Sequence, residues 1–228
     1  MCKAASREYL FRLGANGIIV PIGRDSQVHC FLQGAPKIGK STLLRSALLP
    51  YERFVCGIMV QRLLKKGRLC GYRACVVNGL LPTIERKYQE GLEGIFLYNK
   101  IPLPGILEKV INRAAPLCTK ERFHYILLDE IGGVELLSNQ FMELLWGILA
   151  LGKPVFGVLK SKQNLVQTAR QLNLPDNIFK QWDKLHRHIT LNGKLLTVTR
   201  DNMVQTGNFI EAAINNCRKR SAASGKGR

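Results

Sequence analysis

The stretch from Gly34 to Ser41 reads G-x-x-x-x-G-K-S, and it constrains the fold of this chain more than any other feature. An apolar run, residues 28–33, precedes it, and the apolar spacing of KSTLLRSALL predicts a helix that stops at Pro50. The two glycines allow a loop whose backbone N–H groups turn inward towards an anion, and the helix N-terminus adds its positive dipole end. The pattern therefore predicts a strand–loop–helix unit that holds the phosphates of a nucleotide.

Two residues of this loop are expected to do more than bind. The Lys40 amine can reach the β- and γ-phosphates, which makes it a candidate catalytic group, and the Ser41 hydroxyl can ligate Mg²⁺. An ordinary glycine turn is the alternative interpretation. The predicted nucleotide-binding residues are Gly34, Ala35, Pro36, Lys37, Ile38, Gly39, Lys40, Ser41 and Thr42.

A second candidate site element is the sequence YILLDE, residues 125–130. It reads as a buried strand that ends in two acids, and ligands of α/β folds collect at the carboxyl ends of strands. Asp129 is expected to hold Mg²⁺ together with Ser41, and Glu130 is expected to orient or deprotonate an attacking water. Two solvent-facing carboxylates are the alternative.

Strand-like and helix-like segments alternate through most of the chain, which predicts an α/β fold with a mostly parallel sheet. Residues 53–77 predict a β-hairpin around the turn KKGR, and GIFLYN is the only strand candidate in residues 78–103. Asn192-Gly193 lies between two strand-like runs and predicts a second hairpin, residues 187–199. The expected organisation is a basic extension (1–28), one domain (29–216) and a disordered basic tail (217–228).

Several segments together resemble the family of small thermophile-type nucleoside triphosphatases. They are GAPKIGKSTL (34–43), the hairpin (57–73), DEIGGVEL (129–136), GKPVFGVL (152–159) and VTRDN (198–202). The resemblance covers about residues 29–215, and DEIGGVEL is its most family-specific part. It implies a three-layer, RecA-like P-loop core and slow, Mg²⁺-dependent hydrolysis of ATP, GTP and other nucleoside triphosphates.

The chain departs from the family pattern in four places. Lys37 replaces a glycine of the loop, and Gln61 and Arg62 stand where the family carries two acids. Lys160 ends a segment where the family shows T-x-H or T-x-P, and Met203 replaces an arginine. Nucleotide and metal binding therefore follow from the resemblance more directly than turnover does.

The net charge is strongly positive, with 34 Lys+Arg against 16 Asp+Glu. This excess predicts polyanionic partners, and nucleic acid bound through a basic surface and the basic tail is one candidate. No apolar run is long enough for a membrane span, and seven cysteines without metal-like spacing favour a reducing compartment. We expect a cytoplasmic protein without membrane contact; the sequence does not define its oligomeric state.

Two other functions stay open at this point. One is a nucleotide-gated nucleic-acid-binding protein with little turnover, and the other is a P-loop kinase. Arg62, Arg73 and Lys160 are candidates for a charge-neutralising cation, although ordinary surface cations are the simpler interpretation. His186 and His188 have the spacing of one strand face, where a surface position is favoured over a metal site.

Overall fold

The computed structural model describes residues 11–13, 19–21 and 29–225. Within these residues, nine strands form one sheet in the order β11-β3-β10-β9-β4-β5-β7-β8, and β6 pairs with β4 outside this path. The strands are β3 (His29–Gly34), β4 (Val55–Lys65), β5 (Arg68–Asn78), β6 (Glu85–Lys87), β7 (Ile95–Tyr98), β8 (Ile101–Pro102), β9 (Tyr125–Ile131), β10 (Val155–Leu159) and β11 (Gly193–Val198).

The part of the sheet that carries the phosphate loop is parallel. β11, β3, β10, β9 and β4 pair in parallel with their neighbours, and β10 lies between the loop strand β3 and the acidic strand β9. An inserted strand at this place is the mark of the RecA-like arrangement. The predicted α/β fold with a mostly parallel sheet is confirmed.

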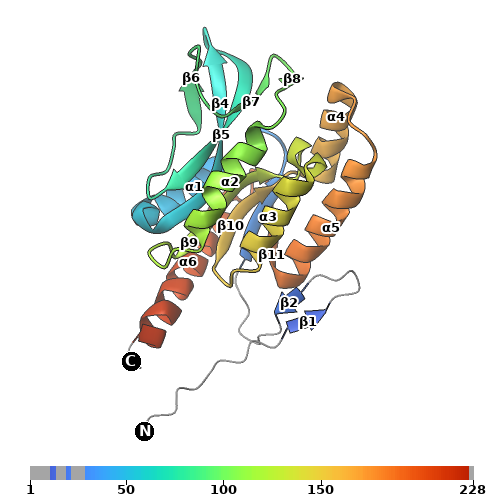
Figure 1. Ribbon diagram of the computed structural model, residues 1–228. Coiled ribbons are helices and arrows are strands. Elements are labelled where there is room, and N and C mark those ends of the chain that lie inside the picture. The colour runs from blue at the N-terminus through green and yellow to red at the C-terminus, as the bar shows by residue number, and fades with distance from the viewer. Residues whose placement is uncertain (1–10, 14–18, 22–28, 226–228) are drawn as a thin grey trace.

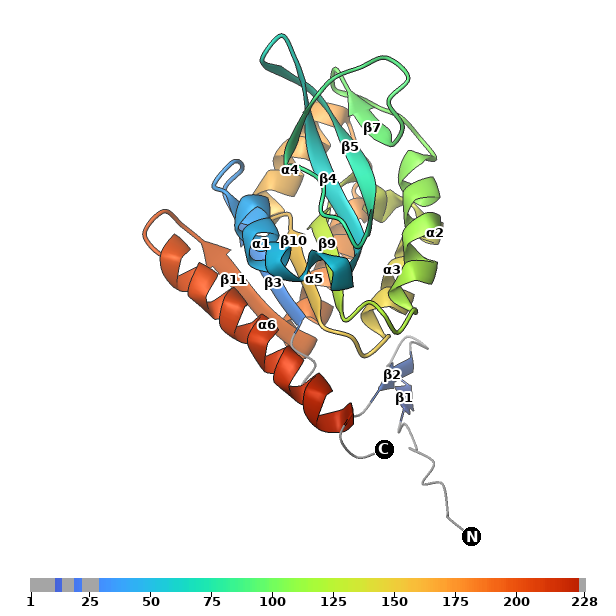
Figure 2. The ribbon, with the colours of Figure 1, turned by 90° about the vertical axis from the view of Figure 1, so that its left-hand side faces the viewer.

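Helices cover both faces of the sheet, which gives three layers (Figures 1 and 2). One core lies under α2, α3 and α5, and the other lies under α1 and α6. Phe31 of β3 belongs to the first core and its neighbour Leu32 to the second, as expected for a strand that is buried on both faces. The helices are α1 (Lys40–Leu48), α2 (Ile106–Cys118), α3 (Asn139–Leu149), α4 (Lys162–Leu172), α5 (Asn177–Asn192) and α6 (Met203–Gly225), with 3-10 turns at Leu49–Phe54 and Val134–Leu137.

The predicted hairpin of residues 53–77 is present as β4 and β5, and it extends beyond the parallel sheet (Figure 1). Only the first part of β4, Val55 to Ile58, pairs with β9. The outer part pairs with β5 and with the short strand β6. β6 and β8 were not predicted, because strands of two or three residues carry too little periodicity to be recognised.

The predicted hairpin around Asn192-Gly193 is wrong. Asn192 is the last residue of helix α5, and Gly193 begins β11, which pairs in parallel with β3. Four buried residues of α5, Ile178, Trp182, Leu185 and Ile189, follow the helical repeat and face the core. This apolar stripe outweighs the local turn preference of an Asn-Gly pair.

The two ends of the chain differ from the prediction in different ways. Helix α6 continues to Gly225, so the segment expected to be a disordered tail, residues 217–228, is helical up to residue 225. Within the expected extension, residues 1–28, β1 (Phe11–Leu13) pairs antiparallel with β2 (Ile19–Pro21), and the rest lies outside the described residues. None of the helices described here is long and apolar enough to cross a membrane.

Candidate active site

The backbone of the phosphate loop takes three unusual conformations between β3 and α1. Gly34, Lys37 and Gly39 have φ angles of 146°, 62° and 103°. A Cβ on Gly34 would lie 2.5 Å from the carbonyl oxygen of Val198, so only glycine fits there. The loop therefore curls tightly from the end of the strand into the first turn of α1, as the sequence predicted.

Lys37 is the loop residue with a strained backbone. Its φ of 62° is in the left-handed region, where a residue with a Cβ is less stable than glycine by about 1 kcal/mol or somewhat more. Its side chain is exposed and borders the cleft described below. Lys37 therefore takes a backbone conformation that glycine adopts without strain, and it adds a cation to the rim of the loop.

The Lys40 amine lies over the loop and donates to the carbonyl oxygens of Gly34 at 3.1 Å and Ala35 at 2.7 Å. Burial lowers the pKa of Lys40, and the charges of Glu130 and Asp129 oppose this shift. The side chain of Asn164, from α4, also donates to the Gly34 carbonyl, at 3.2 Å.

Ser41 and Asp129, far apart in the sequence, are in direct contact. The Ser41 hydroxyl donates to one carboxylate oxygen of Asp129 at 2.7 Å, and the backbone N–H of Val60 donates to the other at 3.3 Å. Asp129 is only 3% exposed. Burial, followed by the charge of Glu130, raises the pKa of Asp129 to about 7.

This pair fits a divalent cation. A buried carboxylate and a hydroxyl are oxygen ligands of the type that Mg²⁺ takes, and a dication here would relieve the unfavourable burial of the Asp129 charge. The described residues contain no cluster of three or more His, Cys, Asp or Glu side chains that could hold a metal. Phosphate oxygens and water would therefore have to complete the coordination, as is usual for Mg²⁺ at nucleotide sites.

Glu130, the second acid of the strand end, has a left-handed backbone with a φ of 57°. The segment after it is fixed by Glu135, whose buried carboxylate accepts from the N–H groups of Gly132 and Gly133, the latter at 2.7 Å. Glu135 belongs to the DEIGGVEL motif, but its role could not be predicted from the sequence. A strained residue held by such contacts is common at functional sites.

A cleft of about 270 Å³ brings these groups together. Of the predicted residues, Pro36, Lys37, Glu130 and the stretch from Gly39 to Thr42 line it, while buried Asp129 contacts it through Ser41. The remaining wall comes from the β4–β5 hairpin with Ile84, from the end of β10 and from α4. Arg62 and Lys160, two of the candidate cations, belong to this wall. Its other residues, which were not predicted from the sequence, are Val60, Tyr72, Ile84, Val158, Asn164, Gln167, Thr168 and Gln171.

Gln61 and Arg62, which depart from the family pattern, differ in their position: only Arg62 lines the cleft. Gln61 is buried, and its amide donates to the Thr83 carbonyl at 2.6 Å while accepting from the Cys75 thiol at 3.2 Å. It is not part of the cleft wall. Arg62 does line the cleft, and it pairs with Glu85 at 3.3 Å.

The histidines at 186 and 188 lie on helix α5 and not on a strand. His186 stacks on Trp182 and His188 meets Trp146 edge-on, with ring centroids 4.7 and 5.1 Å apart. Trp182 belongs to the first core, and Trp146 packs against it. The helical spacing, with the aromatic contacts, makes these histidines packing residues.

The late VTRDN segment forms a turn next to the loop. Asn202 accepts from the Thr199 N–H and donates to the Thr197 carbonyl, both at 2.8 Å. The side chain of the following residue, Met203, lies 3.6 Å from the position of a Cβ on Gly39. The end of β11 therefore supports the phosphate loop from the side opposite the cleft's acidic strand.

Comparisons with known proteins agree with this arrangement. Residues 29–190 match the protein family described as NTPase. A mouse protein named Cancer-related nucleoside-triphosphatase homolog is 25% identical over 76% of this chain and 90% of its own length. Nucleoside-triphosphatase THEP1 from the archaeon Metallosphaera sedula is 23% identical over 64% of this chain and 78% of its own.

A solved structure extends the comparison to the fold. The solution structure of a human cancer-related nucleoside triphosphatase superposes with a TM-score of 0.52 at 20% identity, covering 83% of this chain and 98% of that one. At this identity the likeness concerns the fold alone. The family match across residues 29–190, which is well over half of the chain, shows that the chain belongs to the NTPase family.

Proposed function

We propose that the cleft hydrolyses nucleoside triphosphates to the diphosphate and inorganic phosphate. The observation that carries the proposal is the contact between Ser41 and Asp129, which joins the phosphate loop to the acidic strand end beside Glu130. The family match and the names of the relatives support it. ATP, GTP and other triphosphates are the proposed substrates, with little selection for the base.

Each group has one task in this mechanism. The loop N–H groups and Lys40 bind the β- and γ-phosphates and stabilise the charge that develops there. Glu130 accepts a hydrogen bond from the attacking water and aligns it with the γ-phosphorus. Mg²⁺, held by the Ser41 hydroxyl and the Asp129 carboxylate, would neutralise charge on the phosphate oxygens.

The direct test is phosphate release from ATP, GTP, CTP and UTP in the presence of Mg²⁺. Lys40→Ala and Glu130→Gln should each lower the rate by about 10²-fold or more, because each removes a group that acts on the transition state. Lys66→Ala and Glu121→Gln, which change exposed side chains, are the matched controls. Turnover by Glu130→Gln equal to that of the wild type would contradict the role given to Glu130.

The other predicted partners are not needed for this reaction. Exposed cations near the tip of the β4–β5 hairpin and on β6 offer a place for the predicted nucleic-acid contact: Lys65, Lys66, Arg68, Arg86 and Lys87. That contact stays a prediction, and salt-dependent retention of RNA would test it. The cytoplasmic location, inferred from the cysteines, and the domain limits at residues 29 and 216 also stay predictions.

A further inference from the structure

The cleft contains a cation that the proposed mechanism does not use. Two of the cations that line the cleft lie outside the phosphate loop, Arg62 and Lys160. Arg73, the third candidate from the sequence, does not line the cleft. Arg62 is paired with Glu85 at 3.3 Å. For Lys160, the described part of the chain shows no carboxylate within ion-pair distance. Of these two, Lys160 is therefore the cation without a direct ion pair, although from beyond ion-pair distance its charge opposes the burial that raises the pKa of Glu135.

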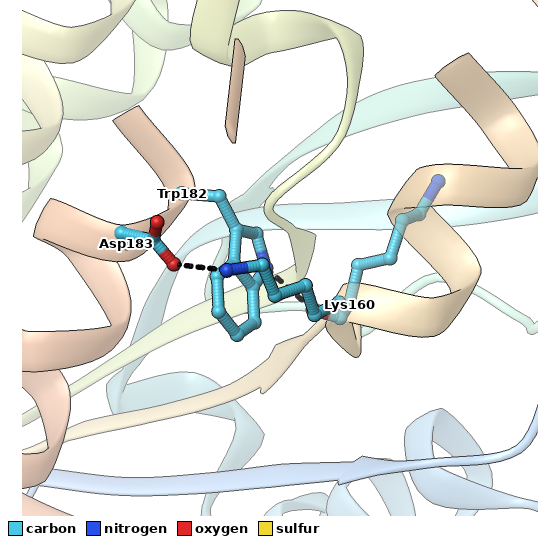
Figure 3. Close-up of polar contacts among 4 residues, drawn as sticks. Lys160, Trp182 and Asp183 are labelled. Carbon is cyan, nitrogen blue, oxygen red and sulfur yellow. Dashed lines mark hydrogen bonds and ion pairs between the residues drawn. The ribbon is translucent and has the colours of Figure 1, made fainter. Parts of the chain in front are cut away.

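The backbone of Lys160 is fixed on both sides. Its N–H donates to the Ile131 carbonyl at 2.8 Å, and its own carbonyl accepts from the indole N–H of Trp182 at 2.8 Å (Figure 3). Ile131 directly follows Glu130, so the two residues are held by one hydrogen-bonded connection between β9 and β10. A group placed on a rigid strand end is positioned better than one on a loop.

The amine itself is weakly held. It donates a long hydrogen bond, at 3.4 Å, to the Thr168 hydroxyl. Figure 3 shows the side chain extending away from Trp182 along the start of α4. A Cβ on Gly133 would lie 3.3 Å from the Lys160 amine and 3.1 Å from a carboxylate oxygen of Glu135. The amine therefore lies beside the segment that follows Glu130.

Lys160 also acts on Lys40 through its charge. Both residues line the same cleft, Lys40 from the phosphate loop and Lys160 from the end of β10, so their like charges repel each other. An anion that binds between them would remove this repulsion and satisfy both amines. In the proposed mechanism the loop N–H groups already bind the β-phosphate. A cation at the end of β10 can therefore add a contact to the γ-phosphate.

We propose that Lys160 is a second phosphate-binding cation of the site, which contacts the γ-phosphate of the substrate from the side opposite Lys40. The inference rests on the proposed function. As the bond from the water oxygen to the γ-phosphorus forms, the water gives up a proton to Glu130, and the bond from the γ-phosphorus to the bridging oxygen breaks with its electron pair leaving on the diphosphate. Lys160 keeps its proton and stabilises the charge on the γ-phosphoryl oxygens. It thereby favours triphosphates over diphosphates in binding.

The experiment combines calorimetric binding with turnover. Lys160→Met should weaken Mg²⁺-dependent binding of a non-hydrolysable ATP analogue by about tenfold or more, because it removes a hydrogen bond to a charged group. Binding of ADP should change less than about twofold, since ADP lacks the phosphate concerned. The turnover number should fall by about 10²-fold, and Lys160→Arg should recover part of both losses.

Lys162→Met is the matched control. Lys162 is two residues away; its amine is paired with Asp183 at 2.8 Å, and the residue does not line the cleft. Its loss should leave both affinities unchanged. Lys160→Gln serves as a second variant if Lys160→Met unfolds early in a thermal melt.

The outcomes separate the two proposals. Equal losses of ADP and ATP-analogue binding in the Lys160 variants would make the residue structural and overturn the inference, as would wild-type selectivity and turnover. If the wild type releases no phosphate, the proposed function fails, but the ratio of the two affinities still decides whether Lys160 binds the γ-phosphate.

Discussion

Asp129 should make the metal-free protein less stable as the pH rises. Its folded-state pKa is about 7, against 3.8 for the ordinary carboxyl, and burial is the main cause. The folded state therefore binds a proton more tightly than the unfolded chain does. The contribution of Asp129 to the free energy of unfolding is full below pH 3.8. This contribution falls as the pH rises above 3.8 and is lost once the pH passes about 7.

The size of the effect follows from the same two values. Each pH unit between them lowers the free energy of unfolding by roughly 1.4 kcal/mol. The full loss is therefore up to about 4 kcal/mol, a large share of the 5–15 kcal/mol that typically stabilises a domain. Asp129→Asn should remove this loss. Its amide can rotate so that the oxygen accepts from the Val60 N–H and the nitrogen donates to the Ser41 hydroxyl.

Urea unfolding without Mg²⁺, repeated from pH 4 to pH 8, measures the prediction. The variant should gain stability over the wild type progressively as the pH rises, while Glu121→Gln, which removes one exposed carboxylate, should not. Adding Mg²⁺ with a nucleotide should stabilise the wild type more than the variant. A difference between variant and wild type that does not depend on pH would refute the account of Asp129.

Three further substitutions test single structural statements. Lys37→Gly should be more stable than Lys37→Ala by about 1 kcal/mol in urea unfolding, because only glycine relieves the left-handed backbone at φ 62°, and equal stability would show no strain. Glu135→Gln should destabilise the protein by about 1–3 kcal/mol and slow phosphate release, since one amide group accepts less strongly from the Gly132 and Gly133 N–H groups. Gln61→Glu, which restores a family acid, should cost about 2 kcal/mol or more in thermal stability and give no gain in turnover, because it buries a charge and removes the donor to the Thr83 carbonyl. A faster Gln61→Glu enzyme would contradict this placement.

The sequence predicted the elements whose signals are local. The loop from Gly34 to Ser41, the strand ending in Asp129 and the hairpin of residues 53–77 each depend on neighbouring residues. The Asn192-Gly193 hairpin failed because its local turn preference competes with a core stripe spread over α5. The left-handed backbone at Lys37 and Glu130 could not be predicted from the sequence, because lysine and glutamate rarely adopt this conformation.

The chemistry of the site depended more on pairing across the sheet. Ser41 and Asp129 could be expected to meet, because both follow carboxyl ends of parallel strands. The choice among Arg62, Arg73 and Lys160 could not be made from their types, since all three are cations. It follows from β6, which brings Glu85 to Arg62, and from β10, which places Lys160 beside the strand of Glu130.

The exchange of two family acids for Gln61 and Arg62 therefore has a limited effect on the charge that a substrate meets. Gln61 points into the packing between β4, β5 and Thr83, where a neutral amide can donate and accept at once. Arg62 reaches the cleft, but Glu85 provides a countercharge beside it. The cations left to act on a triphosphate are Lys37, Lys40 and Lys160, and the acid left to act on water is Glu130. The loss of acids at the hairpin thus leaves the groups of the proposed mechanism in place.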